Sequence, residues 1–70
     1  MSYIAENIRC VIKEKGFKQK NIAIKAGFSE KSFSDLLNGR KTIKAEMIPN
    51  IAAALGVSPN RICYKPKSTA

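Results

Sequence analysis

The sequence contains no histidine, and its two cysteines, Cys10 and Cys63, are not spaced as a CxxC pair. A zinc site would lack its usual ligands, so we expect no metal and no cofactor. General acid–base catalysis near neutral pH most often needs histidine or paired carboxylates, and the five acidic residues are scattered along the chain. We therefore expect neither an enzyme nor a small-molecule substrate. Both cysteines lie in apolar helical stretches, where we expect buried free thiols.

Long apolar runs are also absent. No stretch approaches the roughly 18 residues that a membrane-spanning helix needs, and the first residues do not resemble a signal peptide. We expect a cytoplasmic protein without a membrane partner, although charge alone leaves an anionic membrane surface open. Thirteen Lys and Arg against five Asp and Glu give a formal net charge of +8 and a pI near 9.9. That balance is typical of domains that bind nucleic acid.

Proline is missing before position 49, and no segment alternates apolar with polar residues as a half-buried strand would. Apolar residues instead recur at helical spacing, which predicts an all-α protein. Seventy residues support a single core. The expected helices cover about residues 3–15, 18–26, 29–37, 46–55 and 59–63, and residues 65–70 form a tail.

Each expected helix has an apolar face and recognisable ends. Gly16, Gly27 and Gly56 are placed as left-handed stops, whereas Ser2, Ser29 and Ser58 are placed as N-caps. Pro49 is tolerable only in the first turn of its helix, and Pro59 suits the first position of the last one. The expected core consists of Ile4, Ile8, Val11, Ile12, Ile22, Ala23, Ala26, Phe33, Leu36, Leu37, Met47, Ile48, Ile51, Ala52, Leu55 and Ile62.

The second and third helices, joined by a tight glycine-containing turn, form an arrangement that can present one helix to the major groove of DNA. Their sequence, KQKNIAIKAGFSEKSFSDLLNGR at 18–40, resembles the phage repressor and Cro (XRE-like) family of helix-turn-helix proteins. IAAALGVSP at 51–59 is similar to the family's fourth helix and its exit. The resemblance implies a compact five-helix lambda-repressor-like domain over residues 1–64. The matching residues are Gln19, Ile22, Ala23, Gly27, Ser29, Phe33, Leu36, Asn38 and Gly39.

In this family the second helix of the motif reads base edges and the first crosses the backbone. The implied base-contacting residues point away from the core on the third helix: Ser29, Glu30, Lys31, Ser32, Ser34 and Asp35. The implied phosphate-contacting residues are Lys18, Gln19, Asn38, Arg40 and Lys41, of which the last three lie in the exposed loop after that helix. For Lys13, Lys15, Lys20, Lys25, Lys65 and Lys67 we expect solvated surface positions.

Two features depart from the family pattern. Glu30 and Asp35 are anions on a face expected to meet DNA: they either accept from cytosine amino groups, or Glu30 serves the helix dipole and Asp35 pairs with Lys31. Where many relatives have a buried Arg–Glu pair, this chain has Ile12 and Leu37. Apolar replacement of both partners avoids a stranded charge, so we expect these two side chains to touch.

The resemblance implies sequence-specific binding of a double-stranded DNA operator by a transcriptional repressor. We expect a homodimer with half-sites about 34 Å apart, whose self-contact comes from the fourth and fifth helices, a connecting loop and Tyr64 with the tail. The alternative is a protein-interaction module that keeps the fold without specific DNA binding. Steep weakening of binding by salt would favour DNA over an apolar protein partner.

Overall fold

The computed structural model describes residues 3–64, and these residues contain no strand. The all-α prediction is confirmed. The chain folds into α1 (Tyr3–Lys15), α2 (Gln19–Ala26), α3 (Glu30–Leu37), the 3₁₀ turn η1 (Ala45–Met47), α4 (Ile48–Leu55) and α5 (Pro59–Cys63). Ser2 and the predicted tail at 65–70 lie outside the described residues.

The expected helix bounds agree with the structure to within one residue except at the fourth helix. That helix was expected from residue 46, but the chain first makes the 3₁₀ turn η1 and becomes α-helical only at Ile48. Pro49 lies in the first turn of α4, where its missing N–H costs no helical hydrogen bond. The proline therefore explains why the α-helix begins two residues late.

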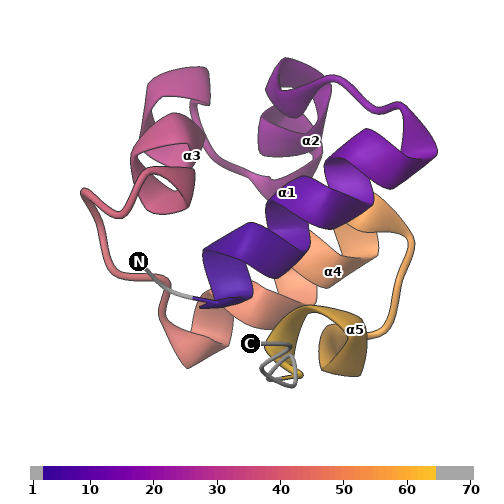
Figure 1. Ribbon diagram of the computed structural model, residues 1–70. Helices are drawn as coiled ribbons and strands as arrows, with labels where there is room; N and C mark the ends of the chain where they lie inside the picture. The colour runs from indigo at the N-terminus through magenta and orange to yellow at the C-terminus, as the bar shows by residue number, and fades with distance from the viewer. Residues whose placement is uncertain (1–2, 65–70) are drawn as a thin grey trace, which may run out of the picture.

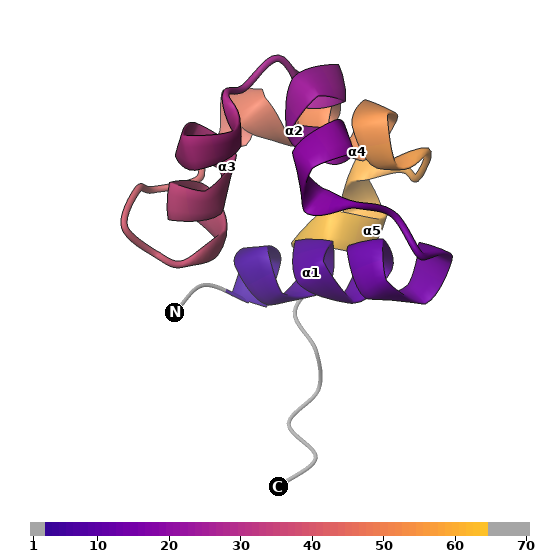
Figure 2. The ribbon, with the colours of Figure 1, turned by 90° about the horizontal axis from the view of Figure 1, so that it is seen from above.

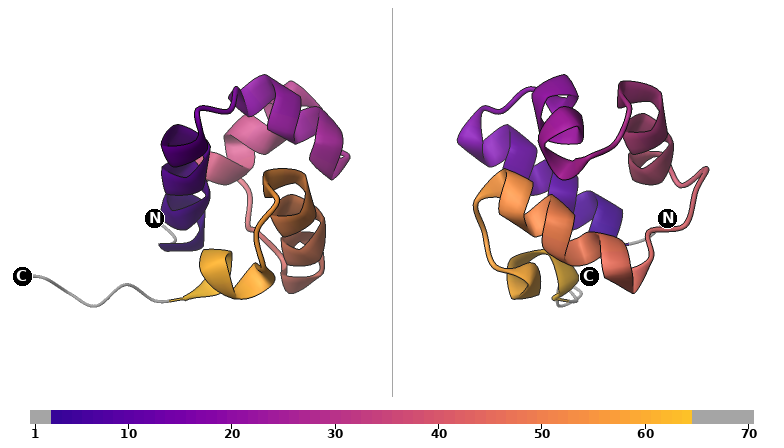
Figure 3. Two further views of the ribbon diagram at one scale, coloured as in Figure 1. Left: turned by 90° about the vertical axis from the view of Figure 1, so that its right-hand side faces the viewer. Right: turned by 180° about the vertical axis from the view of Figure 1, so that it is seen from behind.

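The five helices wrap around one core (Figure 1). α1 crosses the front of the molecule, α4 lies behind it, and α5 closes the lower end, as Figure 1 and the view from behind in Figure 3 show. α2 and α3 lie together at the top and are joined by a short turn. α2 packs on α4, α3 packs on α1 and α2, and α5 packs on both α1 and α4. From above, α3 lies at the edge of the molecule with α1 along one side (Figure 2).

Most of the predicted core is buried. Phe33, Ile8 and Ile51 are fully enclosed, whereas Ile4, Ile12 and Met47 are half-buried against the same cluster. The prediction of a buried Cys10 is wrong, because this thiol is exposed, while Cys63 is half-buried. Cys10 follows Ile8 by two residues, which turns it to the opposite side of α1 from the buried stripe. An apolar stretch of sequence is therefore no guide to burial unless the helical period is applied.

Two polar details refine the predicted helix ends. Asn7 is 4% exposed, and its side-chain amide donates to the carbonyl oxygens of Ile62 at 2.6 Å and Tyr64 at 2.8 Å. It thereby satisfies the open carbonyl end of α5 from a helix 55 positions away. Ser58 occupies the N-cap position of α5 as expected, but its side chain makes no capping hydrogen bond.

Within residues 3–64, no helix is both long enough and apolar enough to cross a membrane.

Candidate nucleic-acid interface

The turn between α2 and α3 is built from backbone hydrogen bonds around one glycine. Gly27 adopts φ +88°, a left-handed conformation that a side chain would strain. The N–H groups of Gly27 and Phe28 donate to the carbonyl oxygens of Ile24 and Ala23 at 3.1 and 2.9 Å, which closes α2. The chain reverses within three residues, so α3 is held at a fixed angle to α2.

α3 begins with a complete cap. Ser29 has extended backbone dihedral angles, and its hydroxyl oxygen accepts the backbone N–H of Ser32 at 3.1 Å. Glu30 stands in the first turn, where a carboxylate favours the positive end of the helix dipole. Both predictions for the start of this helix, the capping serine and the acidic first turn, are therefore confirmed.

The inner face of α3 anchors it to the domain. Phe33, Leu36 and Leu37 are each 2% exposed or less. Phe33 also stacks on Phe28 of the turn, with ring centroids 6.0 Å apart and an interplanar angle of 25°. This pair adds an aromatic contact between the turn and the helix, beyond the area that both rings bury.

The outer face of α3 is open to solvent and polar. Ser29, Glu30 and Lys31 are exposed, and Ser32, Ser34 and Asp35 are half-buried. Lys31 and Asp35 are four residues apart and share the side of the helix that faces away from Phe33. We call the six implied base-contacting residues, all of them exposed or half-buried, the α3 face.

The loop after α3 is tied back onto this face. The N–H groups of Arg40 and Lys41 both donate to the carbonyl oxygen of Asp35, at 2.9 and 3.2 Å. The Lys41 ammonium donates to the Ser32 hydroxyl at 3.2 Å, and the Asn38 amide donates to the Ser34 hydroxyl, also at 3.2 Å. Asn38, Arg40 and Lys41 are themselves exposed. The structure therefore brings the implied phosphate-contacting loop directly beside the implied base-contacting residues.

Lys18 and Gln19 lie apart from this cluster, at the start of α2. Both are exposed, and neither side chain has a hydrogen bond among the described residues. Lys18 is the N-cap residue but provides no side-chain cap. The first N–H groups of α2 are therefore left without a side-chain acceptor, as a helix end that receives a phosphate oxygen would be.

The two departures from the family pattern have different outcomes. Lys31 and Asp35 form no ion pair, and the ion pair found between described residues, Arg61 with Glu14 at 3.3 Å, lies elsewhere. The structure therefore lacks the Asp35–Lys31 pair that was one of the two interpretations of Asp35. Ile12 is half-buried against the core that contains Leu37, on helices α1 and α3, which pack together. Direct contact between these two side chains stays a prediction.

Sequence reasoning missed the hydrogen bond between Lys41 and Ser32, because a distance of nine positions across a loop has no periodic pattern. It also missed Asn7, although a polar residue within the apolar stripe of Ile4, Ile8 and Val11 was visible.

No cluster of three or more potential metal ligands occurs in residues 3–64.

Comparison with known proteins places this geometry in a class. The sequence profile of a family described as helix-turn-helix domain matches residues 5–66, and the chain belongs to this family, as the resemblance to XRE-like proteins implied. Its class is that of helix-turn-helix domains. Among solved structures, the chain is similar to a hypothetical transcription factor, NHTF, from Neisseria, with 30% sequence identity and a TM-score of 0.82. The match covers 91% of this chain and 74% of that one. No curated protein sequence matches the chain significantly.

Proposed function

We propose that this protein is a sequence-specific transcriptional repressor that inserts α3 into the major groove of double-stranded DNA. The observation that carries the proposal is the two-sided character of α3. Its apolar side is held in the core by Phe33, Leu36 and Leu37, and its polar α3 face is open to solvent with the loop cations beside it. A rigid helix with an accessible polar surface suits base readout.

The dimensions of the helix support insertion. An eight-residue α-helix is about 12 Å long and, with side chains, about 10–12 Å wide. The major groove is about 12 Å wide, so it admits one helix of this size. Lys31 and the hydroxyl-bearing side chains of the α3 face then serve as donors and acceptors toward base edges.

Charge supports the backbone contacts. Arg40 and Lys41 adjoin the α3 face, and Lys18 and Gln19 mark the uncapped start of α2. We assign these residues, with Asn38, to phosphates on the two sides of the groove. The net charge of +8 attracts the polyanion over a longer range.

Asp35 is the acidic residue we assign to base readout. Because Lys31 does not neutralise it, its carboxylate is available to accept from a cytosine amino group. Glu30 already has a structural role in the first turn of α3. The proposal is therefore a preference for a C·G pair at the position that Asp35 faces.

We infer that the protein binds its operator as a homodimer. Tyr64 follows α5 and is 51% exposed, and Tyr3 at the start of α1 is 41% exposed. Tyr3 lies one turn before Asn7, whose amide bonds the Tyr64 carbonyl, so the backbones at the two ends of the described chain lie close together. The Tyr64 ring lies against the Arg61 guanidinium, 5.8 Å from its centroid. Exposed tyrosines are frequent anchors of protein interfaces. A dimer that occupies an operator represses by excluding other proteins from it.

Selection of bound duplexes from a random pool tests this proposal. The expected result is an enriched sequence with two-fold symmetry and half-sites one helical turn, about 34 Å, apart. Enrichment of a single asymmetric site would contradict the dimer. Recovery of no preferred sequence at low and moderate salt would contradict specific DNA binding.

A further inference from the structure

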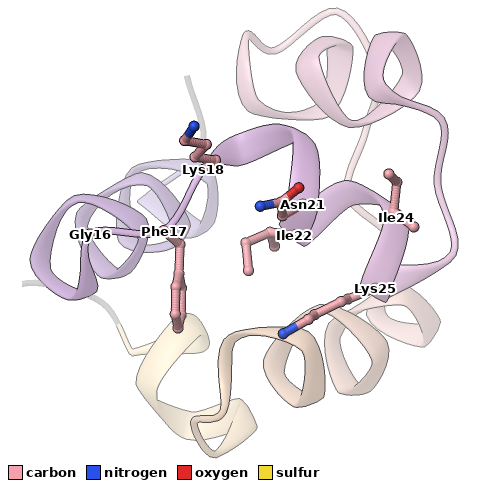
Figure 4. A pocket seen from close by; sticks show the side chains of 7 residues that line it. All are labelled: Gly16, Phe17, Lys18, Asn21, Ile22, Ile24 and Lys25. Atoms are coloured by element: carbon pink, nitrogen blue, oxygen red, sulfur yellow. The ribbon is translucent and has the colours of Figure 1, made fainter.

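An open hollow of about 480 Å³ lies on the outer side of α2 (Figure 4). Its apolar lining comes from Phe17, Ile22 and Ile24, and its charged lining from Lys18 and Lys25. We call this surface, defined by these five residues, the α2 groove. In Figure 4 the Phe17 ring and the extended Lys25 side chain border the hollow below Ile22.

Two of the three apolar side chains of the α2 groove are open to solvent, whereas Ile22 is 1% exposed. Ile24 is 63% exposed and Phe17 is 37% exposed. Ile24 is the most exposed of the large hydrophobic side chains in the described part of the chain, and it has no polar atom that water can satisfy. α2 supplies Ile22, Ala23 and Ala26 to the core, so the fold does not need Ile24 for its core. Covering Ile24 and Phe17 would favour association with a partner.

The charge of the α2 groove is of one sign. From Lys15 to Ser29 the sequence has four lysines and no acidic residue. No carboxylate lines the hollow, and Lys25, expected only as solvated surface, has no ion-pair partner among residues 3–64. A partner must therefore combine apolar side chains with negative charge.

The need for both apolar side chains and negative charge excludes several possible occupants of the α2 groove. A second copy that met this surface with its own α2 groove would bring the same lysines, and residues 65–70 contain Lys65 and Lys67 but no acid. DNA phosphates would satisfy the lysines but would leave Ile24 in water. We propose that the α2 groove binds an acidic segment of a partner protein, whose apolar side chains cover Ile24 and Phe17 while its carboxylates pair with Lys25, and Lys18 keeps the phosphate contact proposed above.

Selection from a random peptide library on the wild-type protein, without DNA, tests the groove independently of the proposed DNA function. Enriched peptides should combine Asp or Glu with Leu, Ile or Phe. Their affinity, measured by fluorescence anisotropy, should fall about tenfold in Ile24→Gln and in Lys25→Gln. A matched variant on another surface, Lys13→Gln, should bind as the wild type does, and the thermal midpoints of all three variants should confirm that they fold.

Four results would overturn the proposal. These are no enrichment, enrichment of peptides without acidic residues, binding that both groove variants retain, and self-association in sedimentation that Ile24→Gln abolishes. Duplex DNA titrations distinguish a further case. If Ile24→Gln and Lys25→Gln weaken DNA binding as much as peptide binding, the α2 groove belongs to the DNA interface instead.

Discussion

Single polar residues connect distant parts of this small domain. Asn7 is the buried polar side chain of the described core, and both hydrogens of its amide are used on carbonyl oxygens at the end of α5. The hydrogen bond to Ile62 is buried, and the one to Tyr64 is partly buried. The side chain therefore holds the last helix of the described chain against the first.

Replacement of Asn7 by Ala should lower the free energy of unfolding by about 1–3 kcal/mol, because it leaves buried carbonyls without donors. Urea denaturation followed by circular dichroism measures this difference. The exposed Asn21→Ala on α2 is the control and should change stability by less than about 0.5 kcal/mol. A loss for Asn7→Ala no larger than that of the control would show that the two hydrogen bonds contribute nothing net.

The N-terminal ends of α3 and α5 offer a direct contrast. Both begin at a serine with extended backbone, but only Ser29 accepts a backbone N–H in its own first turn. Ser29→Ala should destabilise the protein by about 1 kcal/mol, whereas Ser58→Ala should change it by a few tenths at most. Thermal unfolding of the two variants checks this order. Equal losses would mean that the capping bond of α3 is not responsible.

Ile12 of α1 and Leu37 of α3 stand where the family resemblance implies a buried ion pair, and their contact remains a prediction. Ile12→Ala and Leu37→Ala should each destabilise the protein, Leu37→Ala by about 2–5 kcal/mol because this side chain is 2% exposed. If the two side chains touch, the double variant should be less unstable than the sum of the singles by about 0.5 kcal/mol or more. Additive losses, measured in the same denaturation series, would refute the contact.

The elements were predictable where local chemistry decides them. Helical periodicity located α1, α2 and α3, and Gly27 and Ser29 marked the turn between them. Proline shifted the start of α4, because a missing N–H fixes where an α-helix can begin. The exposure of Cys10 and the hydrogen bond from Lys41 to Ser32 depend on how a segment is rotated or folded back, and composition does not encode this.

For the candidate site, the sequence predicted that the residues of the α3 face are accessible, but it did not predict their mutual contacts. The six residues of the α3 face are exposed or half-buried because Phe33, Leu36 and Leu37 take the inner side. The absence of a Lys31–Asp35 pair could not be foreseen, since four-residue spacing permits such a pair without requiring it. The α2 groove was not predicted, because Phe17 lies between two expected helices and Ile24 is not among the expected core residues.

Because the net charge is +8, we expect the binding of DNA to weaken as the salt concentration rises. The logarithm of the DNA association constant should fall linearly with the logarithm of salt concentration. Lys41→Gln should reduce the steepness of that line by about 0.9, the contribution of one lost phosphate contact, and Lys13→Gln on α1 should leave it unchanged. Equal slopes for wild type and Lys41→Gln would remove Lys41 from the backbone contacts, and binding indifferent to salt would favour a protein-interaction module.

In the proposed function, DNA recognition depends most on the α3 face. The direct measurement is the affinity of wild type and Lys31→Ala for the selected operator and for each of its single-base variants, with Lys13→Ala as control. We expect Lys31→Ala to lose about 1–3 kcal/mol of discrimination at one or two adjacent base pairs, and Lys13→Ala to keep the wild-type pattern. Unaltered discrimination in Lys31→Ala, or a loss spread evenly over every base pair, would contradict readout by this face.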